Sequence, residues 1–232
     1  MLFGLFRFDW TILIVLPALF FSLWAQFKVQ STYKKYSKVP TRRGMTGAQA
    51  ARRILDENGL QNVSIEHIRG ELTDHYDPRA NVIRLSDAVH DSKSAAAIGV
   101  AAHEAGHAVQ YAKGYAPMKF RALIIPVTRV GSYLAIPLFF LGLLFVVDAL
   151  MLLGIVLYAT IALFQLATLP VEFNASRRAM AVLRGTRMLD NDELGAAREV
   201  LTAAAMTYVA ALVSSLLTLL RLLVLAGGRR RN

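Results

Sequence analysis

The stretch Ser94–Val109 reads SAAAIGVAAHEAGHAV, and the interpretation of the whole chain depends on it. The run before the first histidine is mostly alanine and contains no proline, so it favours an α-helix. Residues four positions apart lie on one face of a helix, so His103 and His107 present two imidazoles side by side. This is the spacing of a zinc-binding pair.

Glu104 completes an HExxH pattern with the two histidines. Each neutral imidazole gives a zinc ion one nitrogen at about 2.0–2.1 Å, and a catalytic site needs one more protein ligand and an open position for water. Glu104 is placed to take a proton from that water without being a ligand. The alternative is a helix that carries these groups by chance, but an apolar helix gains no stability from three polar groups that nothing pairs.

The composition of the remaining chain is typical of a membrane protein. Of the 232 residues 55% are apolar, and the mean hydropathy of +0.43 argues against a soluble domain. Four stretches lack charge and reach the roughly 17–25 residues needed to span a bilayer: Trp10–Phe27, Val130–Val147, Ala149–Val171 and Val200–Leu220. No small-residue cleavage site follows the first stretch, so it is interpreted as a permanent anchor and not as a secretory signal.

Charge and cysteine content exclude several other classes of function. The net charge is +10, but the basic residues cluster beside the apolar stretches, so nucleic-acid binding is not expected. The residues that follow the first span have the composition of a cytoplasmic flank; they include Lys28, Lys34, Lys35, Lys38, Arg42 and Arg43. The chain has no cysteine, which excludes disulfides, thiolate ligands and cysteine nucleophiles.

The segment ahead of the HEAGH helix is expected to hold a short helix and a small sheet. Thr46 and Gln49 form a capping-box pattern that opens a helix ending near Gly59. Val63–Ser86 alternates imperfectly and predicts two or three short antiparallel strands. An edge strand at Asn81–Leu85 would either pair with an extended peptide or shield the metal helix. Asp87 or Ser92 is expected to cap the metal helix. The remaining histidines are expected to be surface or structural residues; they are His67, His75 and His90.

A third metal ligand must come from the acidic residues that follow the motif, which are Asp148, Glu172, Asp190, Asp192, Glu193 and Glu199. Asp148 lies between two spans that form a tight hairpin, about 30 Å of hydrocarbon away from the motif. The same hairpin returns Glu172 to the side of the motif. Pro170 is expected to close the hairpin, which would place Glu172 in the first turn of a new helix. Asp190 and Glu193 resemble a second capping box, before the last apolar stretch.

Two motifs together resemble a known family. HEAGHAVQ, followed by a membrane hairpin and then LPVEFNASRRA, resembles the neutral zinc metallopeptidases of bacterial membranes, the YugP-like family, over essentially the whole chain. The resemblance implies a bacterial membrane peptidase with His103, His107 and Glu172 as metal ligands and Glu104 as the catalytic base. Zn²⁺ is the implied cofactor.

More distantly, the chain is similar to the membrane gluzincins, which include the heat-shock membrane proteases and the CAAX prenyl endopeptidases. Those proteins carry an acidic residue four positions after the glutamate ligand, where this chain has Ser176. Asn174 or Ser176 is therefore expected to orient a ligand histidine instead. HEAGH also occurs in ATP-dependent membrane proteases, but this chain has no GxxxxGK[ST] phosphate loop. Intramembrane site-two proteases carry their motif inside a span, whereas polar residues flank it here.

The sequence thus predicts a mainly α-helical membrane protein with about four transmembrane helices and a small α+β, zincin-like catalytic portion at the membrane surface. The expected segments are an anchor at 1–27, a cytoplasmic zincin-like portion with the HEAGH helix at 28–129, a transmembrane hairpin at 130–171, a helix with the third ligand and a linker at 171–199, and a C-terminal transmembrane helix at 200–228. The expected location is the bacterial cytoplasmic (inner) membrane, crossed several times, with the active site on the cytoplasmic side.

The expected function is zinc-dependent endopeptidase activity on a peptide or membrane-protein substrate, in contact with membrane lipid and without nucleic acid. Arg177, Arg178 and Tyr111 are unranked candidates for stabilising the oxyanion. The rival function is a catalytically silent membrane scaffold or metal-binding chaperone with the same fold. Glu104 separates the two, because a binding module does not need a base at that position.

Overall fold

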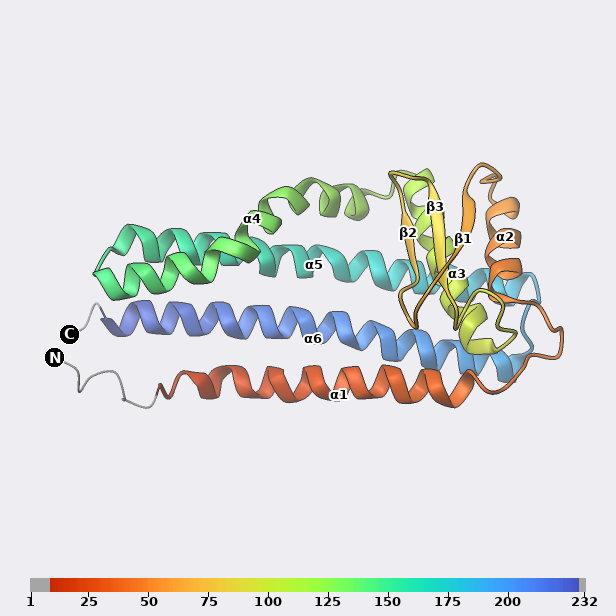
Figure 1. Cartoon of the computed structure of the whole chain (residues 1–232), viewed down its shortest axis with the longest axis horizontal. Coiled ribbons are helices and arrows are strands. Elements are labelled where there is room, and N and C mark those ends of the chain that lie inside the picture. Colours follow the sequence, from red (N-terminus) through yellow and green to blue (C-terminus); the bar gives the residue numbers. More distant parts are fainter. Residues whose placement is uncertain (1–8, 230–232) are drawn as a thin grey trace. The chain divides into compact units, whose positions relative to one another are not determined.

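The computed structural model describes residues 9–229 and consists mainly of α-helix, with one small sheet (Figure 1). Its elements in chain order are α1 (Ile12–Tyr36), α2 (Gly47–Glu57), β1 (Ser64–Ile68), β2 (His75–Asp77), β3 (Val82–Ser86), α3 (Ala95–Ala112), α4 (Ala116–Phe145), α5 (Asp148–Gly185) and α6 (Asn191–Arg229). Residues 1–8 of the expected anchor and residues 230–232 lie outside the described part.

Four helices, α1, α4, α5 and α6, are long and apolar enough to cross a membrane, which confirms the predicted number of candidate spans. Each predicted span coincides largely with part of a longer helix, although α1 begins at Ile12, after Trp10, and α4 ends at Phe145, before Val147. α4 begins at Ala116, well before Val130, and α6 begins at Asn191, before Val200. The tight turn predicted between the second and third spans is confirmed: α4 ends at Phe145, Val146 adopts a φ of 65°, and α5 starts at Asp148.

The chain divides into two compact units. We call them the helical unit, which comprises Met1–Trp24, Arg121–Ala167 and Val209–Asn232, and the mixed unit, which comprises Ala25–Phe120 and Thr168–Tyr208. The helical unit holds most of the apolar length of the four long helices. The mixed unit holds the sheet, the HEAGH helix and the segments of α1, α5 and α6 that continue from the apolar stretches.

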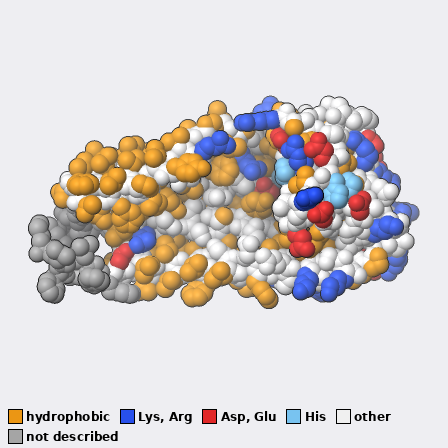
Figure 2. Space-filling model, viewed as in Figure 1, with side chains coloured by type: hydrophobic (Ala, Val, Ile, Leu, Met, Phe, Trp, Pro, Cys, Tyr) orange, Lys and Arg blue, Asp and Glu red, His pale blue; other side chains and the backbone are white. Residues whose placement is uncertain are grey.

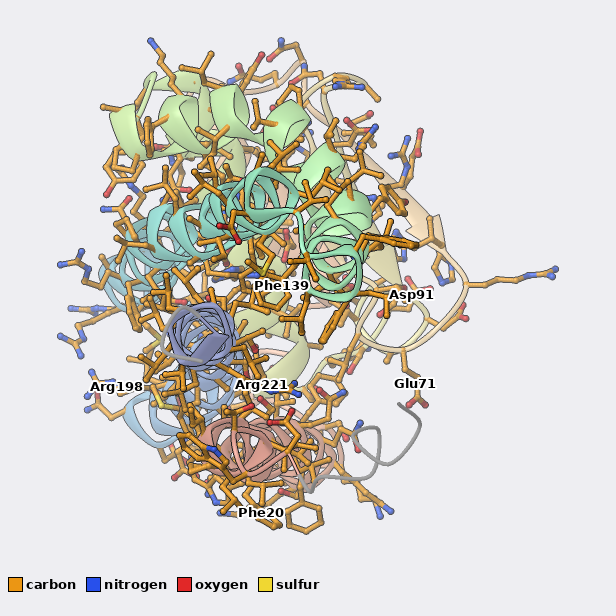
Figure 3. The ribbon with its side chains drawn as sticks, turned by 90° about the vertical axis from the view of Figure 1, so that its left-hand side faces the viewer. Phe20, Glu71, Asp91, Phe139, Arg198 and Arg221 are labelled. Carbon is orange, nitrogen blue, oxygen red and sulfur yellow. The ribbon has the colours of Figure 1, made fainter. Side chains whose placement is uncertain are left out.

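Large apolar side chains are exposed on the helical unit (Figure 2). Figure 3 shows Phe20, which is 65% exposed, pointing away from α1. Phe139 is instead completely buried and packs against Met151 and Leu222. Arg221, a charged residue within the last apolar helix, forms an ion pair with Asp9 at 2.6 Å. An apolar exterior whose charged residue within the last apolar stretch is paired suits contact with lipid chains and not with water.

The sheet of the mixed unit has the strand order β1-β3-β2. β3 pairs antiparallel with β2, but it pairs in parallel with β1. The prediction of an all-antiparallel sheet with Asn81–Leu85 at its edge was therefore wrong. Val82, Ile83 and Leu85 are all buried, because β3 is the central strand and is covered on both faces. Alternation identified the strands, but it carries no information on which strands are neighbours.

α2 and α3 pack on the sheet and form the core of the mixed unit. The predicted capping box at the start of α2 is confirmed, since the Thr46 side chain and the Gln49 side chain each accept a backbone hydrogen bond of the other residue. The cap of α3 was predicted wrongly. Ser94, and neither Asp87 nor Ser92, accepts the hydrogen bond from the Ala97 N–H, at 3.2 Å. Ser92 supports this cap through a hydroxyl contact of 3.1 Å with Ser94.

α5 continues without a break from Asp148 to Gly185, with Pro170 inside it. The prediction that Pro170 ends one helix and that Glu172 lies in the first turn of the next was therefore wrong. Proline removes one N–H from a helix, but long apolar helices tolerate this loss when neighbouring groups satisfy the freed carbonyl. As a result Glu172 lies in the interior of a rigid helix, and a helix N-terminus cannot explain its presence.

Candidate metal centre

α3 places the two histidines and the glutamate of HEAGH in the middle of the mixed unit. The helix is almost completely buried, and its alanines let it lie close to its neighbours. His103 and His107 follow each other on one face, with ring centroids 4.7 Å apart and ring planes at 86°. Glu104 and His107 are 8% and 9% exposed, so both are almost withdrawn from solvent.

α5 supplies the third side chain. Its Glu172 is 3% exposed, and its Oε2 lies 3.2 Å from His103 Nε2 and 3.4 Å from His107 Nε2. The helices approach closely at this point: a Cβ added at Gly106 would lie 2.9 Å from the carbonyl oxygen of Ala175. Ala175 is nearly one turn beyond Glu172, so the close crossing brings the carboxylate to the two imidazoles.

This donor set fits a zinc ion. Ligand atoms of the three residues lie within 4.8 Å of one another. Two ligands bound tetrahedrally at about 2.0–2.1 Å are separated by about 3.3 Å. The two distances from Glu172 Oε2 to the imidazole Nε2 atoms, 3.2 and 3.4 Å, agree with that separation. Two imidazoles and one carboxylate are also a donor set that catalytic zinc sites use.

Hydrogen bonds behind the imidazoles leave both Nε2 atoms directed at Glu172. His103 Nδ1 lies 3.1 Å from the Ser176 hydroxyl, and His107 Nδ1 lies 3.0 Å from Gln110 Oε1. Gln110 is fully buried, and its Nε2 donates to the Val171 carbonyl at 2.8 Å and to Asn174 Oδ1 at 3.0 Å. Such contacts fix the tautomer and the orientation of a ligand histidine.

Of the two residues expected to orient a histidine, Ser176 therefore touches His103 directly, while Asn174 acts one step further away, through Gln110. Sequence reasoning missed Gln110. Its position three residues after His107 on the same helix was the available signal, because such residues are neighbours on the helix surface.

The three expected oxyanion residues lie elsewhere. Arg178 Nε donates to Asn174 Oδ1 at 2.7 Å, so it contacts the network behind the histidines. Arg177 is exposed and lines a groove between α5 and α6. Tyr111 is 54% exposed and its ring lies 6.0 Å from that of Tyr76. The described contacts thus bring none of the three to the ligand atoms.

A cleft of about 510 Å³ opens beside His103 and Glu104. Its walls come from α1, α6 and the loop before β2, and its lining includes Tyr33, Glu71, Asp74 and Tyr208. In the part of the chain that the structure describes, no hydrogen bond engages the Glu104 carboxylate, so it is available to a substrate or to water in the cleft. Burial raises the pKa of Asp74, although hydrogen bonds from Ser86 oppose this shift.

Negative charge around His107 favours its protonated form. Burial lowers the pKa of His107, but the hydrogen bond to Glu172 and the charges of Glu104 and Glu172 outweigh burial, and the net shift is upward. A metal ion must displace this proton to bind Nε2, so metal uptake is coupled to proton release.

The other three histidines lie on the surface side of the mixed unit. His67 stacks on His90, with ring centroids 4.7 Å apart, and the two rings contact Asp87 and Asp91 respectively. Together with Asp91 they form a second group with metal-binding geometry, but an exposed one. His75 Nδ1 lies 2.9 Å from the carbonyl oxygen of Thr73.

Comparison with known proteins agrees with this geometry. The model of the family described as "Putative neutral zinc metallopeptidase" matches residues 11–227. The chain is 48% identical over 222 residues to "Putative membrane protease YugP" of Bacillus subtilis (strain 168), covering 95% of this chain and 99% of that protein. No solved structure matched. The four apolar helices and the membrane relative identify a membrane protein. The chain belongs to the neutral zinc metallopeptidase family.

Proposed function

We propose that this protein is a zinc-dependent endopeptidase of the bacterial cytoplasmic membrane, with a zincin-like catalytic portion formed by the mixed unit. The observation that carries the proposal is the convergence of His103, His107 and Glu172, with Glu104 beside them in an open cleft. A scaffold or metal chaperone would need the three ligands, but it would not need an unpaired carboxylate next to them. The family membership supports protease activity.

Each residue has a defined role in the proposed hydrolysis. Bound zinc supplies a Lewis acid that polarises a carbonyl and acidifies water. Glu104 accepts a proton from the attacking water as the new C–O bond forms. It then passes that proton to the nitrogen of the scissile bond, and the amine leaves as the C–N bond breaks. Ser176 and Gln110 hold the two imidazoles in place throughout.

We further propose a peptide segment or a membrane protein as the substrate. Two of the cleft walls are α1 and α6, whose helices continue as candidate membrane spans. A substrate strand cannot pair with β3, because β3 is bonded on both sides. The free edge of β2 is better placed for such pairing, since the loop that leads into β2 contributes Glu71 and Asp74 to the cleft.

The test is Glu104→Gln in the purified full chain, with zinc content and casein hydrolysis measured together. We expect stoichiometric zinc and loss of hydrolysis, because the amide keeps the shape of the side chain but cannot accept the proton. Glu57→Gln, an exposed position on α2, is the matched control and should behave as wild type. Undiminished hydrolysis by the Glu104→Gln protein would exclude Glu104 as the base, whereas absence of hydrolysis by the zinc-loaded wild type would favour the binding function.

A further inference from the structure

A second cavity, of about 670 Å³, lies between α5 and α6 within the mixed unit. We call it the arginine groove. It is lined by Phe173, Ser176, Arg177, Met180, Ala181 and Arg184 of α5 and by Arg198, Leu201, Thr202, Ala205 and Met206 of α6. Ser176 is shared with the candidate metal centre, because its hydroxyl also contacts His103 Nδ1. The groove therefore adjoins the candidate metal centre at Ser176, but it is separate from the cleft beside Glu104.

The charge of the groove is entirely positive. Its lining includes three exposed arginines and no carboxylate. Within the described residues, Arg184 and Arg198 form no ion pair, and Arg177 donates only to the carbonyl of Phe173 on its own helix, at 3.4 Å. Arg42, by contrast, binds Asp190 and Asp192 at 2.9 Å each. Figure 3 shows Arg198 directed away from the ribbon. Unneutralised guanidinium groups gathered in one groove favour an anion, and their fork geometry suits phosphate.

The groove also changes character along its length. α5 leaves its apolar stretch near Val171 and reaches Phe173 first and Arg184 last. α6 runs the other way, from Arg198 to Met206, where it is already inside its apolar stretch. One end of the groove is therefore apolar and continuous with two candidate spans, and the other end is cationic. The distance from Phe173 to Arg184 along α5 is about 16 Å.

We propose that the arginine groove binds an anionic phospholipid, with its phosphate at the arginines and an acyl chain along Phe173 and Met206. The apolar end favours a lipid over a free phosphate ion, because inorganic phosphate would use only the cationic end. The excess of positive charge favours a lipid with net negative charge over a zwitterionic one. This proposal requires the membrane location of the protein but not its peptidase activity.

The test uses the full chain in neutral detergent, titrated with phosphatidylglycerol or phosphatidylcholine, with binding read by native mass spectrometry. We expect the wild type to prefer phosphatidylglycerol by about tenfold, because both lipids offer a phosphate but only phosphatidylglycerol has a net negative charge to attract the arginines. The double variant Arg184→Gln with Arg198→Gln should lose this preference. Arg184→Lys with Arg198→Lys should retain part of it. Arg43→Gln with Arg79→Gln, which removes the same charge from exposed positions outside the groove, should keep it all.

Two outcomes would overturn the proposal. Zinc content and melting temperature show whether the glutamine double variant is folded. If the folded variant binds phosphatidylglycerol as the wild type does, the arginines are not the binding site. If an excess of inorganic phosphate displaces the lipid completely, the groove recognises a phosphate ion and not a lipid. Loss of lipid preference with retained zinc and proteolysis would support the groove and leave the proposed function intact. Absence of proteolysis in the wild type, with its lipid preference intact, would count only against that function.

Discussion

At the scale of single residues, Glu172 distinguishes a complete zinc site from a pair of histidines. Two imidazoles alone bind zinc weakly, and an anionic third ligand lowers the net charge of the site from +2 to +1. We expect Glu172→Ala to lose most of its zinc and all of its activity while the protein still inserts in the membrane. Metal analysis of the purified variant measures this directly.

Asp192→Ala is the matched control for that change. Asp192 is an exposed carboxylate that pairs with Arg42 at the start of α6, so its loss should leave the zinc content unchanged. Glu193 is a poorer control, because its carboxylate accepts from the backbone N–H groups of Arg42 and Asp190 and stabilises the chain there. Stoichiometric zinc in Glu172→Ala together with its loss in Asp192→Ala would move the third ligand to the later segment.

Gln110 has no role in the chemistry itself, but it should position His107. We expect Gln110→Met to bind zinc about 10–100-fold more weakly, because His107 Nδ1 loses its acceptor. Gln110→Glu keeps an acceptor oxygen for His107 Nδ1, but it replaces the donor to the Val171 carbonyl and Asn174 Oδ1 by a second acceptor, so it should recover only part of the affinity. Zinc competition against a chelator measures both variants. Equal affinities in the wild type and the methionine variant would show that the hydrogen bond does not orient the ring.

The sequence could predict those site residues that lie close together along the chain better than those that lie far apart. The relation between His103, Glu104 and His107 follows from helix periodicity alone. Glu172 was selected by the hairpin and by a family resemblance, because no local pattern links residues so far apart. Gln110 has no motif to mark it, since its function appears only when Val171 and Asn174 are folded against it.

At the scale of elements, the crossing of α3 and α5 sets the geometry of the centre. Gly106 permits this crossing, since an added Cβ would lie 2.9 Å from Ala175 O, a backbone atom that cannot turn aside. We expect Gly106→Ala to destabilise the protein by about 1–3 kcal/mol and to weaken zinc binding by separating Glu172 from the histidines. Thermal unfolding and metal content measure the two effects.

Gly195→Ala is the matched control, because its Cβ would meet no atom within 4 Å. It lies in helix α6, where alanine is favoured over glycine by about 0.5–1 kcal/mol, so this variant should be neutral or slightly more stable. If Gly106→Ala bound zinc and unfolded as the wild type does, the close crossing would not determine the site.

Element pairing was harder to predict than element position. The strands, α2 and the hairpin turn follow from local signals, and the structure has them. The parallel pairing of β1 with β3 does not, because it depends on which edge remains free after β2 and β3 have formed their hairpin. Full burial of Val82, Ile83 and Leu85 indicates a central strand, and the adjacent apolar residues Val82 and Ile83 are the sequence signal that this strand leaves.

At the scale of the whole molecule, the candidate spans were predictable because the hydrocarbon thickness imposes a length on any uncharged helix. Helix boundaries were not. α4 and α6 extend beyond their apolar stretches into polar segments that form part of the mixed unit, and hydropathy does not register such extensions. Pro170 was similarly misleading, since the rule that proline ends a helix holds less well in long apolar helices.

The orientation of the chain in the membrane is the last prediction. Basic residues gather after the first span and again in the segment from Arg177 to Arg198, whereas the hairpin tip around Asp148 has none. The positive-inside rule therefore places the candidate centre in the cytoplasm and the tip outside.

The absence of native cysteine allows single probes at Lys38 and Ala149, both exposed. In intact cells an impermeant thiol reagent should label Ala149→Cys, and it should reach Lys38→Cys only after the membrane is permeabilised. A probe at Asn232 tests the fourth crossing, because a complete span carries the basic tail Arg229–Arg231 outside, against the same rule. Labelling of Lys38→Cys without permeabilisation would invert the orientation and place the metal centre outside the cell.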